Sequence, residues 1–105
     1  MNEELARLDQ DARRAVADGD WSAASEAFAA IAALVPDNSR PWYSLALARL
    51  RGGAVLAARP AVRRCLALAP AHAGAWGLAS SVIGEAADHL RAAVLPGAGT
   101  GVLRA

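Results

Sequence analysis

The chain contains no lysine and only one cysteine, and both shortages narrow what it can be. Cys65 has no partner for an internal disulfide, which excludes a disulfide-stabilised secreted scaffold and favours a reducing compartment. No apolar stretch is long enough and free enough of charge to cross a membrane, and the acidic start MNEELARLDQD contains no signal-peptide core. We therefore predict a cytoplasmic protein without a membrane anchor.

Aromatic and β-branched residues are also scarce, with three Trp, one Tyr and one Phe among 105 residues. Alanine, the strongest helix former, supplies 29 positions, which favours an all-α fold over any sheet. All eleven basic residues are arginine, and this Ala/Arg bias is typical of bacterial genomes rich in G and C. The net charge of +1 divides unevenly, at −5 over residues 1–38 and +6 over residues 39–105.

Side chains able to perform chemistry are few. Cys65, His72 and His89 lack the spacing of a metal site, and we expect Cys65 to be an inert thiol buried in the core rather than a nucleophile. The arginines are scattered and no aromatics lie between them, unlike a nucleic-acid-binding stripe. We expect a protein that is not an enzyme, binds no metal or cofactor, and contacts neither nucleic acid nor membrane.

Gly and Pro residues, which interrupt helices, divide the chain into six predicted short helices. Apolar spacing predicts helices over residues 3–17, about 21–34, about 40–51 and about 73–83, followed by one over about 85–95. A further helix ends at Leu68, but its start stays open because Pro60 either kinks it or marks its first turn. Residues 96–105, with several glycines and a proline, are predicted to form a flexible tail. Short connections favour antiparallel neighbours.

The same residues recur after 34 positions. A shift by that interval places four identical pairs in register: Gly19 on Gly53, Leu34 on Leu68, Pro36 on Pro70, and Trp42 on Trp76. A single helical hairpin cannot bury both sides of its apolar stripe, so a repeated hairpin is expected to stack on its neighbour. We expect Trp42 and Trp76 to fill the gaps that small alanines leave between helices.

This period and its residues resemble the tetratricopeptide repeat (TPR), a pair of antiparallel helices with the pattern W-x2-L-G-x2-Y, A-x3-F and P. Residues 39–72 match it with Trp42-x2-Leu45-Ala46, Ala58-x3-Val62 and Pro70. Residues 5–38 match through Ala24-x3-Phe28 and Pro36, with Leu8 in place of the Trp. Residues 73–95 begin with Trp76 but are shortened, so they are either a third repeat or a capping hairpin. The resemblance implies a TPR-like α-solenoid over residues 1–95.

In proteins similar to this one, the first helix of each unit lines a concave groove that binds a peptide or a helical segment of another protein. The corresponding positions here are Asp9, Arg13, Arg40, Tyr43, Ser44, Leu47, Arg51, Leu78 and Ser81. Tyr43, Leu47 and Arg51 also form an i, i+4, i+8 row suited to anchoring a peptide, although Leu47 packing on its neighbour and Arg51 in solvent is an equal alternative.

The expected function is therefore a non-catalytic protein–protein interaction scaffold. Two alternatives stay open. The repeat could associate with further copies of itself as a homo-oligomer, or it could be the non-catalytic amino-terminal part of a longer enzyme. The identity of the partner is not encoded in any motif of the sequence.

Overall fold

The computed structural model describes residues 2–82, and these residues form helices and turns without a strand. The helices are α1 (Asn2–Ala17), α2 (Trp21–Leu34), α3 (Ser39–Arg51) and α4 (Val55–Leu68), followed by a helix that begins at residue 73. The predicted all-α class and the bounds of the first three helices are confirmed. The predicted helix over 85–95 and the tail over 96–105 lie outside the described residues.

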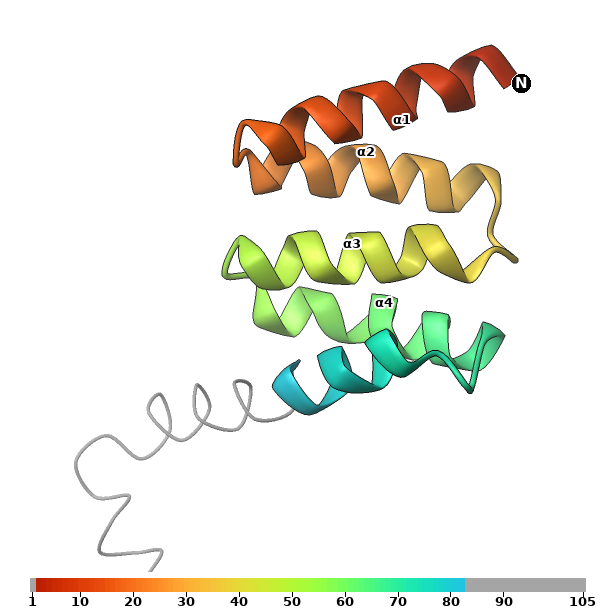
Figure 1. Ribbon diagram of the computed structural model, residues 1–105, viewed down its shortest axis with the longest axis vertical. Helices are drawn as coiled ribbons and strands as arrows, with labels where there is room; N and C mark the ends of the chain where they lie inside the picture. The colour runs from red at the N-terminus through yellow and green to blue at the C-terminus, as the bar shows by residue number, and fades with distance from the viewer. Residues whose placement is uncertain (1, 83–105) are drawn as a thin grey trace, which may run out of the picture.

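Consecutive helices run in opposite directions and pack against each other in chain order, α1 on α2, α2 on α3 and α3 on α4 (Figure 1). Short turns join the helices of each hairpin at one end. Gly19 and Gly53 adopt φ values of 71° and 84° in these turns, a conformation that side-chain-bearing residues rarely enter. None of the described helices is both long and apolar enough to cross a lipid bilayer.

Capping side chains help to explain where α2 and α3 begin. The Asp20 carboxylate accepts a hydrogen bond from the backbone N–H of Ala23 at 3.1 Å and caps α2. The Asn38 side chain accepts from the N–H of Arg40 at 3.1 Å and caps α3. No side chain caps α4, which begins directly after Ala54.

Pro60 lies inside α4, which answers the question that the sequence left open. Because α4 begins at Val55, the proline falls beyond the first turn, where it has no N–H to donate to the carbonyl of Leu56. A proline in a helix interior costs about 3 kcal/mol relative to alanine. The packing of Ala58, Ala61 and Val62 against α3, all buried, offsets that cost.

Backbone and side-chain hydrogen bonds recur at the 34-residue interval. The indole Nε1 of Trp42 donates to the carbonyl of Pro36 at 2.9 Å, and that of Trp76 donates to the carbonyl of Pro70 at 2.6 Å. The turns after α1 and α3 likewise share one bonding pattern, since Asp20 N–H donates to the Ala15 carbonyl as Ala54 N–H does to that of Arg49. These particular hydrogen bonds therefore recur at residues 34 positions apart.

The core is built from small side chains with a few large ones between them. Among the described residues, Leu45 and Cys65 are the largest side chains with less than 2% exposure, and the fully buried alanines let helices approach closely. These alanines, each at 0% exposure, are Ala12, Ala24, Ala32, Ala46 and Ala58. Phe28 packs against all three clusters of buried residues and so connects α1, α2 and α3.

One expectation about the core was wrong. Trp42 is half-buried and packs against the cluster around Leu45, but Trp76 is 56% exposed. The sequence pattern treats the two rings alike, yet the burial of each ring depends on whether a later helix covers it. After Trp42 the chain continues into α4, which folds back on α3, whereas no described helix succeeds the one that carries Trp76.

Candidate functional site

A hollow of about 300 Å³ opens between α1 and the start of α3, and we call it the polar hollow. Its floor is apolar and comes from Phe28 and Ile31 of α2. Its rim carries charged and polar groups from α1 and α3. The lining residues are Asp9, Arg13, Phe28, Ile31, Asn38, Arg40, Pro41 and Ser44. Four predicted groove residues, Asp9, Arg13, Arg40 and Ser44, thus meet at one place.

Local structure sets the positions of these side chains. Asp9 and Arg13 lie one helical turn apart on α1 and form an ion pair at 3.0 Å, with both side chains mostly in solvent. Such an exposed i, i+4 pair contributes only about 0.3–0.5 kcal/mol, so a ligand can compete for either group. Arg40 follows the cap of α3, and Ser44 lies one turn further on. Arg40 makes no ion pair with any residue in 2–82.

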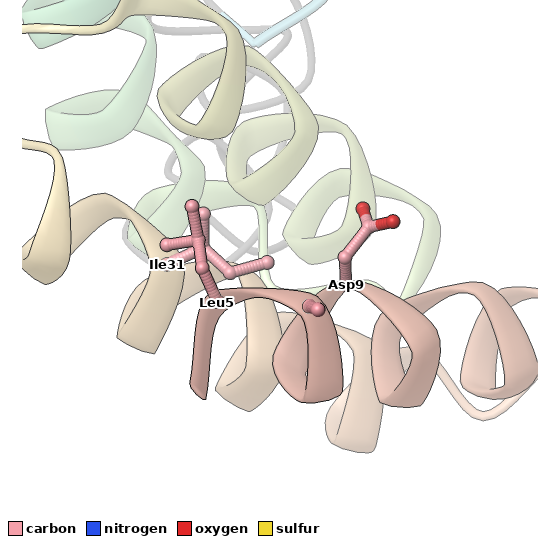
Figure 2. A pocket seen from close by; sticks show the side chains of 4 residues that line it. Leu5, Asp9 and Ile31 are labelled. Carbon is pink, nitrogen blue, oxygen red and sulfur yellow. The ribbon is translucent and has the colours of Figure 1, made fainter. Parts of the chain in front are cut away.

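A second hollow of about 370 Å³ adjoins the first, and we call it the apolar hollow (Figure 2). Leu5, Ala6, Asp9 and Ile31 line it, so the two hollows share Asp9 and Ile31. Leu5 packs against the cluster that contains Ile31. A ligand lying across both hollows would meet aliphatic side chains first and arginine and serine next.

The other predicted groove residues lie outside these hollows. Tyr43 is half-buried, and its ring centroid lies 4.8 Å from that of His72. At Gly74 a Cβ atom would come within 3.1 Å of the Tyr43 hydroxyl, so the missing side chain gives the Tyr43 ring its room. Leu78 packs against the core cluster around Leu45, and Ser81 is exposed.

The row formed by Tyr43, Leu47 and Arg51 is therefore already occupied at both ends by the chain itself. The Arg51 guanidinium lies 5.5 Å from the centre of the Trp21 ring, a cation–π distance. Leu47, between them, is half-buried. Arg51 nevertheless remains exposed.

Three side chains have roles that the sequence pattern does not predict. Phe28 and Ile31 fit the apolar pattern of a core, and they also form the floor of the polar hollow. His72 lacks a metal partner, yet its Nδ1 accepts a hydrogen bond from the N–H of Ala75 at 3.0 Å. The repeat interval in the sequence could have predicted this cap, because residue 72 lies 34 positions after Asn38, which caps α3.

His72 is expected to stabilise the helix that begins at residue 73. Replacement by Asn, the residue that caps α3, should leave the free energy of unfolding within about 0.5 kcal/mol. Replacement by Ala removes the acceptor and should lower it by about 1 kcal/mol. Urea denaturation followed by circular dichroism measures both. Equal losses for Asn and Ala would show that the Tyr43 ring contact, rather than the cap, carries the effect.

Cys65 is buried among apolar groups, as predicted. Burial raises the pKa of its thiol, so the thiolate needed for nucleophilic attack or metal binding is disfavoured. Among residues 2–82, no group of three or more His, Cys, Asp or Glu side chains is arranged to hold a metal ion.

No protein-family model matches the sequence, and searches of curated proteins and solved structures give no match either. A function for the chain can therefore be proposed only from its own sequence and geometry.

Proposed function

We propose that this chain is a TPR-like interaction module that binds an extended peptide or a helical segment of another protein across the polar and apolar hollows. The observation that carries the proposal is the convergence of α1 and α3 side chains over the floor of Phe28 and Ile31. In this proposal the module is non-catalytic, uses no cofactor and acts in the cytoplasm. The 34-residue recurrence of caps, turns and indole hydrogen bonds supports the assignment to the TPR family.

The chemistry of the polar hollow suits a polypeptide ligand. A peptide backbone offers both N–H donors and carbonyl acceptors. Arg40 and Arg13 supply donors, Asp9 supplies an acceptor, and the Ser44 hydroxyl can do either. Each is within reach of one segment because all four line the same hollow.

The apolar hollow would add affinity by taking an aliphatic or aromatic side chain of the same segment. Burial of apolar area contributes about 25 cal/mol per Å², and interfaces concentrate their binding energy at a few such anchors. The adjoining charged rim would then orient the segment. Peptides with one apolar residue followed by polar or acidic residues are the expected ligands.

A peptide selection with the purified chain tests this proposal. Peptides enriched from a random display library should bind the wild type, and Ser44→Arg, which fills the polar hollow, should weaken their binding by about tenfold or more. Ser22→Arg is the matched control, because it places the same side chain on a different hollow lined by α2 residues. Fluorescence anisotropy with labelled peptides gives the affinities.

Peptides that bind the wild type and Ser44→Arg equally would place the binding surface elsewhere. A selection that enriches no peptide above background would contradict peptide binding itself.

A further inference from the structure

Charge is sorted along the described part of the chain. Residues 39–82 contain six arginines and not one acidic residue. Residues 2–38 contain three arginines and eight acidic residues, all of the latter exposed: Glu3, Glu4, Asp9, Asp11, Asp18, Asp20, Glu26 and Asp37. The two consecutive helical hairpins therefore carry opposite net charge.

Three of the six arginines in residues 39–82 are held by other described parts of the chain. Arg49 donates from Nη1 to the Ala57 carbonyl at 2.9 Å, and Arg51 lies over the Trp21 ring. Arg64 reaches the Asp37 carboxylate at 3.6 Å. Arg59 and Arg63, by contrast, make no hydrogen bond or ion pair with residues 2–82.

Arg59 and Arg63 lie one turn apart on the exposed side of α4, beside Leu56, whose side chain is 46% exposed. We call Leu56, Arg59 and Arg63 the arginine face. Like charges at i, i+4 destabilise a helix by about 0.2–0.5 kcal/mol. An apolar residue exposed beside unpaired charges of one sign is a surface that an acidic partner would stabilise.

The acidic counterpart lies on the same chain, around the start of α2. Residues 15–38 contain four acidic residues and no arginine. Asp37 is paired with Arg64, and Asp20 caps α2 through one of its oxygens. Asp18 and Glu26 are exposed and unpaired within residues 2–82. We call Asp18, Asp20 and Glu26 the acidic face.

We propose that the arginine face of one copy docks on the acidic face of a second copy. The proposed contact is head-to-tail, with one arginine face on one acidic face, so each added copy leaves one face of each kind open and the copies form chains. Exposed ion pairs contribute about 0.2–1 kcal/mol each, so the association is weak and sensitive to salt. The polar hollow takes no part in it and stays available to a peptide.

Sedimentation velocity of the full chain tests the contact. In about 25 mM NaCl the weight-average sedimentation coefficient should rise steadily up to about 500 µM protein, and in about 500 mM NaCl the apparent Kd should increase by about tenfold or more. Arg59→Glu/Arg63→Glu should weaken self-association by about tenfold or more, and so should Asp18→Arg/Glu26→Arg. An equimolar mixture of these two variants should associate again, because each now carries the face that the other lost.

The matched control is Arg7→Glu/Arg13→Glu on α1, which changes the net charge by the same amount as Arg59→Glu/Arg63→Glu at residues that belong to neither face. It should leave the apparent Kd within about threefold, and circular dichroism should show native helicity for every variant. Leu56→Gln, which changes no charge, should weaken association by about threefold or more. Three results would each overturn the proposal. The wild type could stay monomeric over this range, the control could self-associate as weakly as Arg59→Glu/Arg63→Glu, or the mixture of the two face variants could stay monomeric.

Discussion

Replacement of Leu45 by alanine is expected to lower the free energy of unfolding by about 2–5 kcal/mol. The Leu45 side chain is 1% exposed and belongs to the cluster that holds α3, α4 and Val82 together. Its neighbours Ala46 and Ala58 are too small to fill the cavity that the substitution leaves. Because domains of this size are stable by only about 5–15 kcal/mol, the loss removes a large share of the total.

Leu56→Ala is the control for this measurement, since it deletes the same atoms from a leucine that is 46% exposed on α4. Its cost should stay within about 1 kcal/mol. Urea denaturation monitored by circular dichroism compares the two variants. If Leu45→Ala costs no more than Leu56→Ala, the core does not lie between α3 and α4.

The two tryptophans at the repeat interval should respond very differently to removal. Trp42→Ala is expected to cost about 3 kcal/mol, because the half-buried ring packs on the Leu45 cluster and its indole holds the Pro36 carbonyl. Trp76→Ala deletes the equivalent hydrogen bond to Pro70 but far less packing, so its cost should be about 1 kcal/mol. Guanidinium denaturation of both variants gives their free energies of unfolding, which separate the contribution of ring packing from that of the indole hydrogen bond.

Trp42→Phe extends the comparison, because it keeps an aromatic ring but not the indole donor. It should recover more than half of the stability lost in Trp42→Ala. Equal costs for Trp42→Ala and Trp76→Ala would mean that the shared hydrogen bond, and not burial, sets the value of each ring.

The helix boundaries were predictable where the residue itself dictates the backbone. Gly19 closes α1 because its positive φ suits no other residue well, and Asp20 caps α2 through its own carboxylate. Pro60 could not be resolved, because its local preference opposes the helix and the outcome depended on how strongly α4 packs on α3. The exposure of Trp76 was missed because a repeat pattern identifies equivalent residues and does not state how much of each ring its neighbours cover.

The site was predictable only in part. The TPR resemblance implied that Asp9, Arg13, Arg40 and Ser44 line one groove, and these four residues line the same hollow. The same reasoning could not tell that Tyr43 would meet His72 or that Arg51 would lie over Trp21. Those contacts join residues of different elements. They depend on how the helices pack against each other, which the residue pattern of a single helix does not specify.

The equivalent bonding of the turns at Pro36 and Pro70 has a consequence for how such a chain can change in length. The junction after Asn38 and the junction after His72 present the same kind of cap and the same indole contact. A tandem copy of residues 39–72 would therefore meet, at both of its ends, the bonding partners that the original segment already has. Tandem duplication of residues 39–72 can therefore lengthen the chain by one helical hairpin at a time, with the same hydrogen bonds at each new junction.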